Sequence, residues 1–117
     1  MNTDVTIYHN PRCSKSRQTL ALLEEQSITP EIIKYLETPP DASTLKALLT
    51  MLGLEPRQLM RKKEAEYGEL GLDNPELSED ALIQAMVTHP RLIERPIVVK
   101  DGKAAIGRPP EQVLDIL

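Results

Sequence analysis

The spacing of apolar residues divides the first third of the chain into a strand, a helix and a second strand. Val5–His9 is a short β-branched and aromatic run, which predicts a buried strand. From Ser14, leucines recur at helical spacing until Pro30, because proline and the residue before it both resist helix. Residues 31–36 form another short apolar run and predict the second strand.

Helical spacing dominates the middle of the chain. Asp41 is a candidate N-cap of a helix that Gly53 closes, and Ser78 is a candidate N-cap of a helix that stops before a proline. Between them, Pro56 stands at a favourable first helical position. Helix continued from that proline would place Arg61 on an exposed helix face.

The end of the chain returns to strand spacing. Residues 95–99 predict a third strand, and Asp101-Gly102 predicts a tight turn into a short return strand, since Asp-Gly favours hairpin turns. Residues 109–117 begin with two prolines and predict a closing helix.

This order of elements is β-α-β, a helical block, a β-hairpin and a helix, which is the order of the thioredoxin and glutaredoxin fold. Its first half implies a parallel strand pair with a right-handed crossover, and the hairpin adds antiparallel partners. We therefore predict an α/β fold with a mixed sheet. It forms one domain over residues 1–117, with a helical insertion at about 41–90.

Composition limits the classes of protein that fit. The chain has 117 residues, 27% of them charged, and a net charge of −4, which suits a globular protein and argues against nucleic acid as the main partner. No apolar run approaches the ~20 residues that span a bilayer, and the first residues do not resemble a signal peptide. With one cysteine and no export signal, the expected location is the reducing cytoplasm, without a membrane partner.

The single cysteine, Cys13, is the main chemical candidate. Lone cysteines are often buried and inert. Here, however, the residue follows a strand and a turn and meets the start of a predicted helix, where the helix dipole favours a thiolate. Arg12, Lys15 and Arg17 add positive charge, and the loop looks too polar to belong to the core. We therefore predict a reactive thiolate.

The spacing of residues around Cys13 argues against several known cysteine chemistries. A Cys-x-x-Cys pair would need a second cysteine where Ser16 stands, and a Cys-x5-Arg phosphatase loop would need arginine in place of Thr19. One cysteine and two histidines without zinc-site spacing make a metal improbable. His9 and His89 are candidate bases, but no group that would orient either can be identified. A thiolate that takes its second thiol from another molecule remains, and glutathione is the obvious cytoplasmic donor.

The motifs "YHNPRCSKSR", "LMRKKE", "LIERPIVV" and "IGRPPEQVLDIL" occur in this order and cover nearly the whole chain. As a set they resemble the glutaredoxin-coupled arsenate reductase family. The resemblance implies a thioredoxin-like fold with a helical insertion. It places the nucleophile on Cys13, the site arginines on Arg61, Arg95 and Arg108, the histidine and serine near the thiol on His9 and Ser16, and a cis-proline on Pro96.

The resemblance also implies a reaction and its partners. Cys13 attacks arsenate, glutathione attacks the adduct, and glutaredoxin clears the mixed disulfide; no cofactor or metal stays bound. Arginine suits this work, because its guanidinium matches oxyanion oxygens with paired hydrogen bonds.

Two other functions remain open at this point. One is a glutathione-linked monothiol oxidoreductase without an arsenate role. The other is a thioredoxin-fold transcription regulator that binds RNA polymerase, favoured only by the basic cluster Arg61-Lys62-Lys63 and disfavoured by Ser16 in place of a second cysteine.

Overall fold

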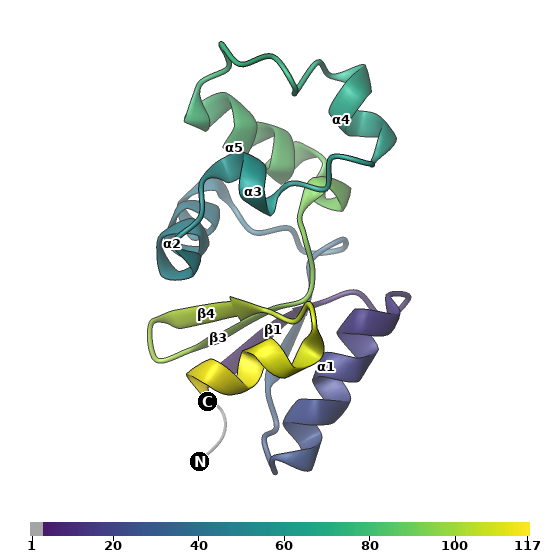
Figure 1. The fold of residues 1–117 in the computed structure, drawn as a ribbon, viewed down its shortest axis with the longest axis vertical. Helices are drawn as coiled ribbons and strands as arrows, with labels where there is room; N and C mark the ends of the chain where they lie inside the picture. Colours follow the sequence, from purple (N-terminus) through teal and green to yellow (C-terminus); the bar gives the residue numbers. More distant parts are fainter. Residues whose placement is uncertain (1–3) are drawn as a thin grey trace. The chain divides into compact units, whose positions relative to one another are not determined.

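The computed structural model describes residues 4–117, which form two compact units. The first unit joins the chain before Pro39 to the chain after Glu94, and the second is Pro39–Glu94. Figure 1 shows the elements of both. None of the helices in this part of the chain has the length and apolarity that crossing a membrane requires.

A mixed four-stranded sheet with the strand order β2-β1-β3-β4 forms the centre of the first unit. Its strands are β1 (Val5–His9), β2 (Glu31–Lys34), β3 (Ile97–Lys100) and β4 (Lys103–Ile106). β1 pairs in parallel with β2 and antiparallel with β3, which pairs antiparallel with β4, so the predicted mixed sheet is confirmed. β2 ends at Lys34 rather than at residue 36, because the N–H groups of Glu37 and Thr38 both donate to the Lys34 carbonyl and close a turn.

Two helical elements, α1 (Ser14–Glu25) and η2 (Pro110–Ile116), pack against this sheet and against each other (Figure 1). The predicted closing helix is a 3-10 helix, in which the Gln112 N–H donates to the Pro109 carbonyl three residues earlier. Aliphatic side chains from both elements and from the strands fill the core between them. The buried members are Val5, Ile7, Leu23, Ile28, Val98 and Val113.

The turn between β3 and β4 follows its sequence. Asp101 has φ 51° and Gly102 has φ 76°, so both central residues lie in the left-handed region. This conformation twists in the same sense as the flanking strands, which explains why Asp-Gly forms the hairpin.

The second unit is helical and begins and ends its longer helices as predicted. Its elements are α2 (Ala42–Leu52), α3 (Pro56–Leu59), α4 (Ala65–Glu69), α5 (Glu79–Thr88) and the 3-10 helix η1 (Pro90–Leu92). The Asp41 carboxylate accepts from the Thr44 N–H at 2.8 Å, and Ser78 Oγ accepts from the Ala81 N–H at 3.1 Å. Gly53 closes α2 with φ 68°.

The expected helix face around Arg61 is wrong. The chain leaves the helix after α3, and Met60 forms an isolated antiparallel bridge with Ile93. The Arg61 N–H donates to the Leu92 carbonyl at 2.7 Å. Two short helices therefore flank an extended segment that carries Arg61, because the backbone there pairs with a distant segment instead of its own preceding turn.

Gly107, directly after β4, marks a close approach between two segments of the first unit. Its N–H donates to the Pro96 carbonyl at 2.9 Å. A Cβ at this position would lie 2.9 Å from Pro96 Cγ and would collide with the buried Thr19 side chain of α1. Only glycine lets the end of β4 pass this close to α1.

Substituting Gly107→Ala should therefore lower the free energy of unfolding by about 1–3 kcal/mol, the usual cost of overpacking a close contact. Urea denaturation followed by circular dichroism measures this change. Gly68→Ala is the matched control, because a Cβ there meets no atom within 4 Å. That variant should be unchanged or more stable by up to about 1 kcal/mol, since alanine favours helix. Equal stability of the two variants would contradict the assignment.

Candidate functional site

Cys13 lies at the N-cap position of α1, as predicted. Its backbone is extended (φ −94°, ψ 125°), and its N–H donates to the Asn10 carbonyl at 3.0 Å. The first N–H groups of α1 have no partner within the helix, so the positive end of the helix dipole lies at this residue. Cys13 is only 8% exposed, whereas Pro11, Arg12 and Ser14 around it are exposed, so the polar loop lies mostly outside the core, as expected, with the cysteine among its buried members.

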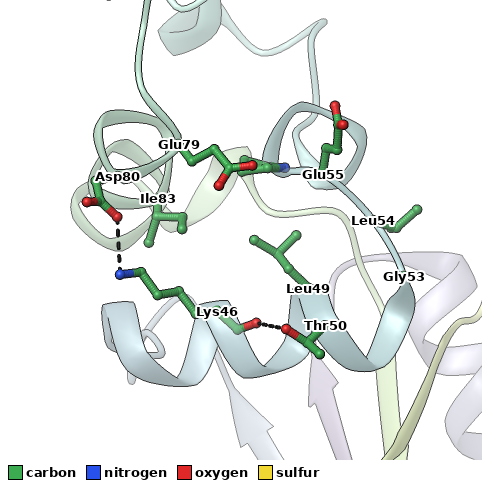
Figure 2. Close-up of a pocket in the computed structure, with 10 residues that line it drawn as sticks. Lys46, Leu49, Thr50, Gly53, Leu54, Glu55, Glu79, Asp80 and Ile83 are labelled. Atoms are coloured by element: carbon green, nitrogen blue, oxygen red, sulfur yellow. Dashed lines mark hydrogen bonds and ion pairs between the residues drawn. The ribbon is translucent and has the colours of Figure 1, made fainter.

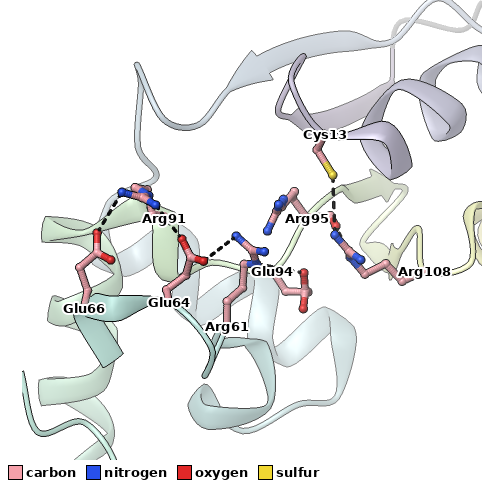
Figure 3. Close-up of polar contacts among 8 residues, drawn as sticks. All are labelled: Cys13, Arg61, Glu64, Glu66, Arg91, Glu94, Arg95 and Arg108. Carbon is pink, nitrogen blue, oxygen red and sulfur yellow. Dashed lines mark hydrogen bonds and ion pairs between the residues drawn. The ribbon is translucent and has the colours of Figure 1, made fainter. Parts of the chain in front are cut away.

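Arg108 is the cation that contacts the thiol. Its Nη2 lies 3.6 Å from Cys13 Sγ, and its Nε donates to the Arg95 carbonyl at 2.8 Å. Figure 3 shows the Arg95 and Arg108 side chains next to Cys13. The second hydrogen bond fixes the guanidinium plane, so the Nη2 edge of the group is held at the sulfur. A guanidinium in this position stabilises a negative charge on the thiol or on an anion beside it.

Arg95 lies two residues before β3, and its backbone carbonyl contacts Arg108. The Arg95–Pro96 peptide bond is cis, as the resemblance implied for Pro96, and the Arg108–Pro109 bond is cis as well. The Arg95 side chain is half-buried, and its carbonyl accepts from Arg108. The structure therefore brings Cys13, Arg95 and Arg108 together within the first unit.

His9 ends β1 with its side chain 6% exposed. Burial, together with the positive charges of Lys34 and Arg17, lowers the pKa of His9 below its ordinary value. The imidazole is therefore neutral at neutral pH. Its Nδ1 has no hydrogen-bond partner among the described residues, and no hydrogen bond there joins His9 to Cys13.

Ser16 and Arg17 hold the loop that precedes the thiol. Ser16 is fully buried, and its Oγ accepts from the Asn10 N–H at 3.3 Å. The Arg17 Nη1 donates to the Pro11 carbonyl at 3.0 Å. Both side chains thus tie the first turn of α1 back to the Asn10–Pro11 turn.

Arg61 belongs to the second unit, and carboxylates surround it. Its Nη1 lies 3.5 Å from Glu64 and its Nε 3.8 Å from Glu94. Glu64 also accepts from Arg91 at 3.1 Å, and Arg91 reaches Glu66 at 3.8 Å (Figure 3). These contacts orient Arg61 within its unit. They do not test its predicted role in the reaction, which stays a prediction.

A cavity of about 560 Å³ in the second unit has the wrong charge for an oxyanion. Its lining includes the carboxylates of Glu55, Glu79 and Asp80 (Figure 2). The one lysine there, Lys46, forms an ion pair with Asp80 at 3.1 Å. Carboxylates repel anions, so this cavity does not suit the oxyanion that the sequence motifs implied.

Residues 8–116 match the model of the family described as the ArsC family, which is nearly the whole chain. The chain belongs to the ArsC family. This membership agrees with the family that the sequence motifs indicated.

Three proteins similar to this chain align over nearly the whole of both chains. The chain is 63% identical to the uncharacterized protein YfgD of Escherichia coli strain K12, with 100% of this chain and 99% of that protein covered. It is 56% identical to an arsenate reductase of Neisseria meningitidis serogroup A, with 97% and 98% covered. A solved structure of an arsenate reductase from Vibrio cholerae is 61% identical, covers 100% of both chains and has a TM-score of 0.97. The thioredoxin-like fold class is confirmed.

Two site features of this ArsC-family chain were missed from the sequence. Asn10 shapes the loop before the thiol, because its Oδ1 accepts from the Arg12 N–H at 3.0 Å while its carbonyl accepts from Cys13. The Asn-Pro dipeptide was the signal for such a turn. Lys34 stands opposite His9 in the parallel register, which follows from strand pairing and cannot be derived from spacing.

Within residues 4–117, no group of three or more metal-ligating side chains is placed to hold a metal ion.

The neutral His9 should make folding stability depend on pH. Because its pKa is below the ordinary 6.5 in the folded chain, the unfolded chain binds more protons below that pH. The stabilisation is present above pH 6.5 and is lost as the pH falls through the folded pKa. Urea denaturation from about pH 7.5 to about pH 5 should show wild type losing more stability than His9→Asn. Parallel pH profiles for the two proteins would contradict this reading of His9.

Arg108 should control the reactivity of the thiol. Replacing it in Arg108→Gln should slow iodoacetamide alkylation of Cys13 near neutral pH by about two- to fivefold, as a partly exposed charge pair is worth about 0.5–1 kcal/mol. Mass spectrometry follows the reaction. Lys103→Gln removes an exposed charge in the β3–β4 hairpin and serves as the control. A faster reaction in Arg108→Gln would show that the side chain acts by covering the sulfur.

Proposed function

We propose that this chain is an arsenate reductase in which the Cys13 thiolate attacks arsenate and glutathione supplies the second thiol. The observation that carries the proposal is the Arg108 guanidinium 3.6 Å from the sulfur at the start of α1. Family membership and the names of the relatives support the substrate.

The first step forms a bond between sulfur and arsenic. The Cys13 thiolate attacks arsenic, and one oxygen of arsenate leaves as water after taking up protons. Arg108 and Arg95 pair with oxygens of the bound anion and offset the charge that builds up during the attack. The first N–H groups of α1 are further donors to the same anion.

The second step reduces arsenic. The glutathione thiol attacks the adduct, and a disulfide forms between its sulfur and Cys13. The electron pair of the sulfur–arsenic bond leaves with arsenic, which becomes arsenite; two thiols have then lost one electron each. A glutaredoxin thiol attacks the mixed disulfide and returns Cys13 to the thiolate. Arg61 takes part as a third oxyanion-binding arginine.

The need for an outside thiol rests on the residues of this chain. Cys13 is its only cysteine. Ser16 occupies the place of a second thiol and is committed to a hydrogen bond with the loop backbone. The chain cannot form an internal disulfide, so each turnover requires a sulfur from another molecule.

A coupled assay tests the proposal. Purified protein with arsenate, glutathione, glutaredoxin and glutathione reductase should oxidise NADPH, and Cys13→Ser should abolish this. Arg108→Ala and Arg95→Ala should lower kcat/KM for arsenate by about 100-fold or more, the usual effect of losing an oxyanion donor. Both variants should unfold at nearly the same urea concentration as wild type, and Lys103→Gln should have full activity.

Other outcomes identify the alternatives. Reduction of glutathione mixed disulfides without arsenate turnover would indicate a monothiol oxidoreductase. Recovery of RNA polymerase by the tagged protein, with no turnover of either substrate, would indicate the regulator.

A further inference from the structure

A second cavity of about 310 Å³ lies beside the loop that precedes Cys13. Its walls come from the end of β1, the Asn10–Arg12 loop and the turn after β2. The lining residues are His9, Asn10, Pro11, Arg12, Lys34, Leu36 and Glu37. Its volume falls at the lower end of the range for small-molecule sites. Neither Arg95 nor Arg108 belongs to this lining, so the cavity is distinct from the oxyanion site.

Pairing of the two parallel strands builds this cavity. His9 lies opposite Lys34, so the carboxyl ends of β1 and β2 meet at one edge of the sheet, where ligands of open α/β sheets often bind. The Glu37 N–H donates to the Lys34 carbonyl at 2.9 Å and fixes one wall. The Arg17 bond to Pro11 fixes the other wall. Both walls are therefore formed without a ligand.

The charges in the lining follow a simple pattern. Arg12 and Lys34 are exposed cations, and Glu37 is an exposed carboxylate. Pro11 and the 40%-exposed Leu36 add apolar surface between them. His9 is neutral at neutral pH and adds no charge. A complementary ligand carries two negative groups, one positive group and a short apolar or polarisable stem.

We propose that this cavity binds the thiol co-substrate, a small peptide thiol of the glutathione class. Glutathione has two carboxylates and one ammonium, which match two cations and one carboxylate. Cys13 itself does not line the cavity. Residues 10–12, which do, directly precede it, and the Cys13 N–H donates to the Asn10 carbonyl, so the cavity is built on the turn that carries the residue in need of a second sulfur. This inference rests on the proposed function, because that function requires the outside thiol.

Binding is tested apart from turnover. The full-length Cys13→Ser protein, labelled with ¹⁵N, is titrated with S-methylglutathione, which cannot react. Amide shifts should cluster at Asn10, Arg12, Lys34 and Glu37. Lys34→Gln should raise Kd by about three- to tenfold, as expected for the loss of one charged contact. Lys34→Arg should retain affinity, and Lys103→Gln, which removes an exposed lysine outside the cavity, should bind like wild type. Shifts confined to other surfaces, or wild-type affinity in Lys34→Gln, would overturn the proposal.

A ligand variant identifies the charge that is recognised. The glycine ethyl ester of S-methylglutathione lacks one carboxylate, and a second analogue lacks the other. At least one of the two analogues should bind wild type more weakly than S-methylglutathione does. On Lys34→Gln or on Arg12→Gln, that same analogue and S-methylglutathione should bind with equal affinity. Such coupling shows that the deleted carboxylate and the deleted cation meet. Independent losses for every pair would overturn the charge assignment.

Turnover separates this inference from the proposed function. Cysteamine is a thiol without carboxylates. In arsenate reduction, Lys34→Gln should lower the rate with glutathione and leave the rate with cysteamine unchanged. If Lys34→Gln lowered the rate equally with glutathione and with cysteamine, the cavity would not be the thiol site, although arsenate reduction itself would still be supported. Lys34-dependent binding of S-methylglutathione, with no arsenate turnover by any thiol, would support the cavity and reject arsenate reduction.

Discussion

The geometry of the thiol site depends on one close approach, where the backbone at Gly107 touches α1. The side chain of Thr19 and the ring of Pro96 occupy the space that a Cβ would need. This contact sets the end of β4 against the first turns of α1, and the next residue, Arg108, then reaches the sulfur of Cys13. A residue without a side chain thus determines where a charged one lies.

The arginines proposed for the reaction have different neighbours within their own units. In the first unit, Arg108 contacts the sulfur of Cys13 and the backbone carbonyl of Arg95. In the second unit, Arg61 has two carboxylate neighbours, Glu64 and Glu94, within 4.0 Å. An anion that approaches Arg61 must therefore compete with these two carboxylates. The reaction that we assign to Cys13 uses Arg108 first, because that group is already at the sulfur.

Much of the fold could be predicted because its signals are local. The Asp41 and Ser78 caps, the left-handed Gly53 and the Asp101-Gly102 turn each act within a few residues. The segment around Arg61 could not be predicted, since a backbone pairing across more than thirty positions in the sequence replaced helix there. Cys13 was identified by its place before a helix.

The burial of the thiol also limits the end of the proposed cycle. With Cys13 only 8% exposed, the sulfur of the mixed disulfide that faces outward is the one from glutathione. A large protein thiol can approach that outer atom more easily than the inner one. Attack there expels the inner sulfur as the leaving group, and the helix dipole and the Arg108 guanidinium favour the anion that departs. In the proposed cycle, the burial of Cys13 therefore selects which of the two sulfurs is attacked.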